Sequence, residues 1–286
     1  MTRTMAQRDI AVGIDPVRNW HLALAWAADE ALLRGMGLRL VVAISPQHDL
    51  QHVNDATYRF AQQKAAAETL RAALAWSQNR HPGVKASCAL LDGAPATVLA
   101  SLSRKVGMVV LGSRHLSRTE EFLSADSLVV PVTAKAQCPV AVVGDAEHVT
   151  QETPYLVVGI DGSDSSRASL TWAIEEADRR RCALRAIAVW QPPVFSLHSG
   201  DTMFRAERRL LSETTAGLAE KYPDVHLTHE VAIGSPVEML ANAAEHALAV
   251  VVGRRGRGGY TGMRVGSVVH GLLHRAHCPV ITVPAG

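Results

Sequence analysis

Short, continuous runs of apolar residues alternate with longer amphipathic segments along the whole chain. Runs such as residues 108–111 and 248–252 consist of Val, Leu, Met and Ala, and unbroken apolar runs of this length are typical of parallel strands buried on both faces. The amphipathic segments between them are long enough to be the helices that connect such strands. The pattern therefore predicts an α/β fold in which helices cover both faces of a parallel sheet.

The pattern is clearest in the second half of the chain. It predicts strands near residues 155–161, 184–190, 227–232, 248–253 and 279–283. It predicts helices near residues 165–181, 203–221, 236–246 and 266–276. Such a half is a doubly wound, Rossmann-like unit with a five-stranded parallel sheet. Ligands of these units bind outside the carboxyl ends of the strands, at the switch point between the first strand and the fourth.

The chain also repeats itself. The recurring segments are IAVGID at 10–15 and LVVGID at 156–161, WAADEA at 26–31 and WAIEEA at 172–177, GAP at 93–95 and GSP at 234–236, and CPV at 138–140 and 278–280. The spacing is 146 residues for the first two pairs, 141 for the third and 140 for the fourth. The sequence therefore predicts two tandem domains, residues 1–147 and 153–286, joined by the polar stretch around 144–154.

Composition narrows the possible functions. Hydrophobic residues make up 48% of the chain and charged residues 20%, which suits a globular protein with a large core. The apolar runs are shorter than the roughly 20 residues that span a bilayer, and residues 1–9 lack the apolar core of a secretion signal. A net charge of +2 and 5% aromatic residues argue against nucleic acid binding. Four widely spaced cysteines suit reduced thiols, so we expect a cytoplasmic protein that contacts neither membrane nor nucleic acid.

A loop rich in glycine and arginine follows the fourth strand of the second half. It runs from Gly253 to Ser267 with the sequence GRRGRGGYTGMRVGS, and it ends where a helix is predicted to begin. Glycines let the backbone approach a ligand closely, and the N–H groups and positive dipole of a helix N-terminus attract anions. The loop alone leaves two interpretations open. It is either a phosphate cradle or a flexible basic surface loop whose Ser267 caps the helix.

The spacing within this loop adds a resemblance. The arrangement Gly-x2-Gly-x9-Gly-Ser resembles the ATP-binding signature of the universal stress protein family, and both halves are similar to that family, which implies a tandem form. The resemblance implies ATP as the ligand, with or without Mg²⁺. It implies that the phosphates and ribose contact Gly253, Gly256, Gly266 and Ser267, followed by Val268. It also implies that Asp161 contacts the ribose or the adenine edge, and that Val189 and Val252 line the adenine pocket.

Two of these residues also have plainer interpretations. A carboxylate at a strand end can accept hydrogen bonds from ribose hydroxyls or an exocyclic amine, and the alternative is that Asp161 caps the helix that follows it. Val189 offers a flat apolar wall for a base, but a valine on a buried strand is ordinarily part of the core.

The equivalent loop of the first half has lost the signature. His115 stands where the second glycine would be, Asp126 stands in place of the third, and Glu120 and Glu121 add negative charge. A carboxylate at a helix N-terminus caps the helix and excludes phosphate. Pro16 replaces the glycine that follows Asp161 in the second half, which stiffens the turn. We therefore expect the first half to bind no nucleotide.

The sequence shows no catalytic machinery. It lacks a Walker loop, and we identify no pair of nucleophile and base. His270, His274 and His277 have helical spacing, but no carboxylate or thiolate matches it, which favours a polar helix face over a metal site. We therefore expect a regulatory or signalling module of a stress response. The alternatives are a slow ATPase or phosphotransferase, and a protein-interaction module that needs no nucleotide.

The resemblance also implies how the protein associates. The fifth strands, near 139–143 and 279–283, end each sheet, and bare apolar edges invite pairing. The family resemblance implies pairing of the two halves through these strands and a homodimer of chains. A regulatory protein partner is also expected, although the sequence does not identify it.

Overall fold

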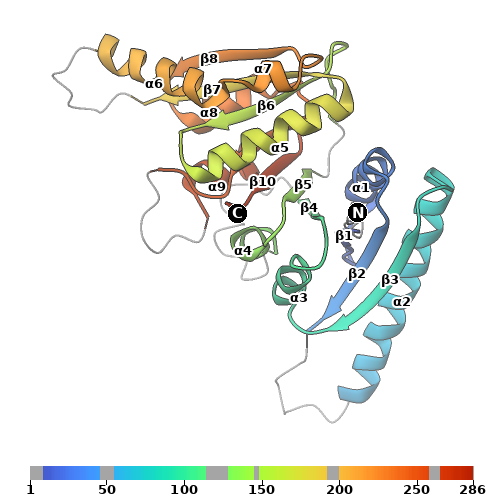
Figure 1. The fold of residues 1–286 in the computed structure, drawn as a ribbon. Helices are drawn as coiled ribbons and strands as arrows, with labels where there is room; N and C mark the ends of the chain where they lie inside the picture. Colours follow the sequence, from blue (N-terminus) through green and yellow to red (C-terminus); the bar gives the residue numbers. More distant parts are fainter. Residues whose placement is uncertain are drawn as a thin grey trace, which may run out of the picture. The chain divides into compact units, whose positions relative to one another are not determined.

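The structure is a computed structural model that describes residues 9–45, 55–113, 128–144, 148–191, 200–257 and 265–285. The described residues up to 144 belong to one compact unit, the N-terminal unit, and those from 148 onward belong to a second, the C-terminal unit. Figure 1 labels the helices and strands of both.

The N-terminal unit has a five-stranded sheet in which every pair of neighbouring strands is parallel. Its strand order is β3-β2-β1-β4-β5. Its elements are β1 (Ile10–Gly13), α1 (His21–Arg34), β2 (Leu38–Ile44), α2 (Asp55–Arg80), β3 (Ala86–Asp92), α3 (Pro95–Leu102), β4 (Met108–Ser113), α4 (Val129–Lys135) and β5 (Val140–Gly144).

The C-terminal unit repeats this topology, with the strand order β8-β7-β6-β9-β10 and parallel pairs throughout. Its elements are β6 (Tyr155–Ile160), α5 (Asp164–Arg180), β7 (Ala183–Trp190), α6 (Gly200–Thr215), α7 (Leu218–Lys221), β8 (Leu227–Ile233), α8 (Pro236–Ala243), β9 (Ala249–Gly253), α9 (Ser267–Arg275) and β10 (Val280–Val283). The doubly wound fold predicted from the repeat is confirmed.

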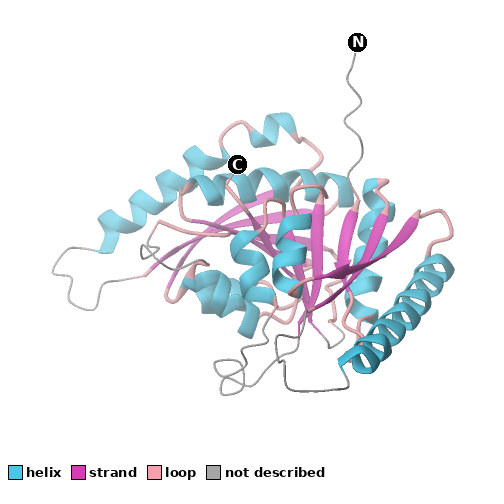
Figure 2. Cartoon of the chain, turned by 90° about the horizontal axis from the view of Figure 1, so that it is seen from below, coloured by secondary structure: helices cyan, strands magenta, loops and turns pink. Residues whose placement is uncertain are grey.

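Helices cover both faces of each sheet, as the colours of Figure 2 show. In the C-terminal unit α5 packs on β6 and β9, α6 packs on β7 and β8, and α8 packs on α9. Because crossovers between parallel strands are right-handed, α5 and α6 lie on one face, and α8 and α9 lie on the other. Strands β6 and β9 are neighbours in the middle of the sheet and are almost fully buried. The loops that leave their carboxyl ends therefore start side by side.

One expected helix is wrong in detail. The single helix predicted over 203–221 is two helices, α6 and α7, and Gly217 between them has φ of +76°. A left-handed residue cannot continue an α-helix, and glycine adopts this conformation at the lowest cost. Among the helices of the described ranges, none is both long enough and apolar enough to cross a bilayer.

Candidate functional site

A pocket of about 230 Å³ lies at the carboxyl ends of β6 and β9. It is the switch point of the C-terminal unit, since β6 pairs with β7 on one side and with β9 on the other. All eight site residues predicted from the sequence line this pocket. They are Asp161, Val189, Val252, Gly253, Gly256, Gly266, Ser267 and Val268. The topology thus brings together residues that lie up to 107 positions apart in the sequence.

One wall of the pocket is the N-terminus of α9. The N-cap is Gly266, with extended backbone angles, and a glycine has no side chain with which to cap the helix. The interpretation in which Ser267 is the cap is therefore wrong, because Ser267 lies in the first turn of the helix. The first N–H groups of an α-helix have no partner within the helix, and together with the helix dipole they form an anion-binding site. Residues Gly266 to Val269 all line the pocket.

Another part of the lining is apolar. Val189 and Val252 belong to it, and so do Ile187, Leu240 and Pro236, which the sequence analysis did not single out. Ile187 and Val189 lie two residues apart on β7, so they share a face of the strand, and this spacing could have identified Ile187. Val189 is only half-buried, which suits a pocket wall better than a core position.

Asp161 lies where β6 ends, and its carboxylate accepts three hydrogen bonds. Oδ1 accepts from the N–H of Ser163 at 3.0 Å and from Oγ–H of the same serine at 2.6 Å, and Oδ2 accepts from the N–H of Arg257 at 2.8 Å. The cap of α5 is Ser163, whose Oγ accepts from the N–H of Ser166 at 3.1 Å. Asp161 therefore supports the cap and does not provide it.

These hydrogen bonds set the ionisation of Asp161. Burial raises its pKa, but the bonds donated by Ser163 and Arg257 favour the charged form and outweigh burial, so the pKa lies below the ordinary value of 3.8. The carboxylate is therefore ionised at neutral pH.

A pH dependence of stability follows from this lowered pKa. A carboxyl whose pKa is lower in the folded state stabilises the fold above its unfolded-state pKa, and this stabilisation disappears as pH falls through the folded-state pKa. We expect the parent to unfold at higher urea concentration than Asp161→Asn at pH 7, and the difference to shrink below about pH 4. Urea titrations of both proteins at several pH values check this, and a constant difference down to pH 3 would contradict it.

Two glycines of the loop have contacts that exclude a side chain. An ideal Cβ at Gly253 would lie 2.7 Å from both the backbone carbon and Oγ of Ser165, and one at Gly256 would overlap Oδ2 of Asp161. Gly266 differs, because the nearest atom to its ideal Cβ is the carbonyl oxygen of Arg254 at 3.4 Å. The protein's own packing therefore requires the first two glycines and tolerates a side chain at the third.

The matching turn of the N-terminal unit is built differently. The N–H of Val17 donates to Oδ1 of Asp15 at 2.9 Å, as the N–H of Ser163 does to Asp161, but Asp15 also pairs with the side chain of Arg18 at 3.1 Å. In the C-terminal unit Gly162 has φ of +77°, which Pro16 cannot adopt. Helix α1 begins at His21, three residues later in the repeat than α5. His115, Glu120, Glu121 and Asp126 lie outside the described residues.

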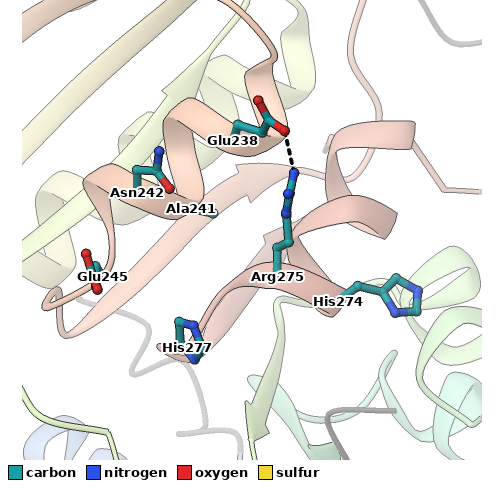
Figure 3. A pocket seen from close by; sticks show the side chains of 7 residues that line it. All are labelled: Glu238, Ala241, Asn242, Glu245, His274, Arg275 and His277. Atoms are coloured by element: carbon teal, nitrogen blue, oxygen red, sulfur yellow. Dashed lines mark hydrogen bonds and ion pairs between the residues drawn. The ribbon is translucent and has the colours of Figure 1, made fainter. Parts of the chain in front are cut away.

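A larger hollow of about 430 Å³ lies between α8 and the end of α9 (Figure 3). Its polar lining includes Glu238, which pairs with Arg275 at 2.7 Å, together with Asn242, Glu245 and His277. His274 also lines the hollow, and in Figure 3 it lies at the end farther from Glu245. Most of these side chains are exposed, and the hollow lies away from the switch point. The smaller pocket is therefore the better candidate, because it combines an anion site with an apolar wall.

The histidines of α9 are His270 and His274. The rings of His270 and His274 lie 4.8 Å apart. Within the described ranges, no group of three or more His, Cys, Asp or Glu residues is placed to hold a metal ion.

Comparisons with known proteins agree with the repeat. The family model described as "Universal stress protein family" matches residues 7–144 and 155–284. The universal stress protein Rv2623 of Mycobacterium tuberculosis H37Rv is 33% identical over 297 residues, which cover 95% of each chain. The crystal structure of a universal stress protein from Archaeoglobus fulgidus DSM 4304 has a TM-score of 0.70 at 19% identity, over 98% of this chain and 97% of that one. A structure from Archaeoglobus fulgidus in complex with dAMP covers 48% of this chain and 97% of that one, at 23% identity and a TM-score of 0.34.

Proposed function

Since the chain belongs to the universal stress protein family and carries two copies of its domain, we propose that it is an ATP-binding regulatory or signalling module of a stress response. The nucleotide is held in the C-terminal unit. The observation that carries this proposal is that one pocket is lined by the loop at 253–267, which we call the glycine loop, by the N-terminus of α9 and by apolar side chains.

The chemistry of the pocket suggests how ATP lies in it. The phosphates face the N–H groups of Ser267, Val268 and Val269, where the helix dipole favours negative charge. The base lies against Val189 and Val252. The volume of about 230 Å³ is below the roughly 300–1,000 Å³ of typical small-molecule pockets, so the described residues enclose only part of the nucleotide.

Mg²⁺ fits this site only when the phosphates of the nucleotide coordinate it. Among the described residues that line the pocket, Asp161 is the one carboxylate, and its oxygens already accept three hydrogen bonds. Mg²⁺ keeps several waters and commonly takes its remaining ligands from substrate phosphates. In this proposal the protein therefore binds the nucleotide, and the phosphates supply most ligands of the metal.

The N-terminal unit acts as a partner domain without nucleotide. This part of the proposal rests on the loss of the glycine signature and on the different turn after Asp15. None of the four cysteines, all of which lie in the described ranges, is in a disulfide, and the proposed location is therefore the reducing cytoplasm. We further propose that the chain forms a homodimer through its strand-five edges and regulates a protein partner. Light scattering at micromolar concentration tests the homodimer, and a monomer contradicts it.

The identity of the ligand can be tested on protein purified from cells. We expect mass spectrometry of heat-denatured protein to detect released ATP, and no nucleotide to be released from the Ser267→Ala variant prepared in parallel. Steady release of ADP from added ATP and Mg²⁺ would favour the slow ATPase. If no nucleotide is released and none binds, the nucleotide-independent interaction module becomes the better account.

A further inference from the structure

The glycine loop is fastened to the turn that follows β6. The N–H of Arg257 donates to Oδ2 of Asp161 at 2.8 Å, and the N–H of Arg255 donates to Oγ of Ser165 at 3.4 Å. Gly256, between these two arginines, lies so close to Asp161 that a Cβ there would overlap its carboxylate. The first turn of the loop is therefore packed directly against the end of β6.

The same turn of the loop is connected to the N-terminus of α9. The N–H of Gly266 donates to the carbonyl oxygen of Arg254 at 3.0 Å, and the N–H of Arg254 donates to the carbonyl oxygen of Val283 at 3.0 Å. Residues 254–257 thus contact Asp161 on one side and the N-cap of α9 on the other. A change in how Asp161 holds this segment changes the position of the N–H groups that face the pocket.

We propose that Asp161 is a positioning residue, which fastens the glycine loop so that the N-terminus of α9 faces the phosphates, and that it does not contact the ribose. This inference rests on the proposed function, and it replaces the ribose or adenine contact that the family resemblance implied for Asp161.

The hydrogen-bonding capacity of the carboxylate supports this role. A carboxylate has about four acceptor positions, and three of those on Asp161 are filled by donors of the protein itself. The lowered pKa indicates that these donors hold the charged form firmly. The N-terminal unit shares the bond from the residue two positions on, Val17, but there the carboxylate of Asp15 also pairs with Arg18.

The first test needs no ligand. Arg254, Arg255 and Arg257 are potential trypsin sites within the fastened segment. Asp161→Asn keeps the shape of the side chain and removes its charge, so we expect trypsin to cut the loop at least about tenfold faster in this variant than in the parent. Asp15→Asn, at the matching position of the N-terminal unit, is the control and leaves the rate unchanged. Equal rates in Asp161→Asn and the parent overturn the proposal.

The second test separates positioning from ribose contact. We expect Asp161→Asn to weaken ATP binding about 10- to 100-fold, the range for loss of hydrogen bonds to a charged group. Calorimetry with ATP, 2′-deoxy-ATP and 3′-deoxy-ATP then forms a double-mutant cycle. A positioning residue leaves the affinity ratios among the three nucleotides the same in parent and variant. A ratio that collapses toward one in the variant shows a ribose contact and overturns the proposal.

A second variant breaks the same bond from the loop side. Arg257→Pro removes the N–H that donates a hydrogen bond to Asp161, whereas Arg257→Ala keeps this N–H. We expect the proline variant to bind ATP at least about tenfold more weakly than the alanine variant. Equal affinities overturn the proposal. If the parent itself binds no ATP, the proposed function fails, and trypsin cleavage of Asp161→Asn alone decides whether the loop is fastened.

Discussion

Replacing Gly253 with alanine is expected to lower the free energy of unfolding of the C-terminal unit by about 2 kcal/mol, within the usual range for overpacking a tight site. The added Cβ would lie 2.7–2.8 Å from the backbone carbon, Oγ and Cβ of Ser165. Two of these atoms belong to the rigid start of α5 and cannot rotate away, so β9 and α5 must move apart. Urea denaturation monitored by circular dichroism measures the change.

The repeat supplies a matched control for this substitution. Gly112 occupies the equivalent position at the end of β4, but the nearest atom to its ideal Cβ is Cβ of Ala23 at 3.7 Å, an ordinary contact. We expect Gly112→Ala to change the free energy of unfolding by less than about 0.5 kcal/mol. Equal destabilisation by both substitutions would show that the close packing of β9 on α5 is not what requires glycine at position 253.

Replacing Gly266 with alanine is expected to have the opposite profile, with a large loss of ATP affinity and little loss of stability. Gly266 has φ of −65°, which alanine adopts readily, and its ideal Cβ is 3.4 Å from the nearest atom. We expect the free energy of unfolding to fall by less than about 1 kcal/mol, the cost of alanine at an N-cap. The new methyl group would face the backbone of residues 254–256, between the loop and the N-terminus of α9 where we propose that the phosphates bind, so we expect ATP affinity to fall at least about tenfold.

Calorimetric titration and urea denaturation of the same preparation measure both effects of Gly266→Ala. Gly112→Ala again serves as the control and binds ATP like the parent. Unchanged ATP affinity in Gly266→Ala would place the phosphates elsewhere and contradict the proposed orientation of the nucleotide.

The sequence predicted most of the fold because both of its signals are strong. Unbroken apolar runs marked the buried strands, and recurring segments such as 10–15 and 156–161 fixed the number of units. Once the topology was predicted, the switch point followed, since parallel strands place their carboxyl ends at one edge. This is why Asp161 and the loop that begins at Gly253 could be assigned to one place, while the individual contact residues, Ser267 included, followed from the family resemblance.

The sequence could not predict contacts made by the backbone. The N–H of Arg257 that holds Asp161 leaves no trace in residue identity, so the aspartate was interpreted as a ligand contact or a helix cap. Ser163, the actual cap of α5, was not singled out. The break at Gly217 was missed because a lone glycine in an amphipathic segment is often tolerated, and only its left-handed backbone ends the helix.

The most direct test of the central claim is a calorimetric titration of ATP into the full chain, with and without Mg²⁺. We expect one ATP to bind per chain, in the C-terminal unit, and none to bind at the N-terminal unit. Two ATP molecules per chain would contradict the proposal that the N-terminal unit binds no nucleotide. The absence of any binding heat or retained nucleotide would contradict the proposed function itself.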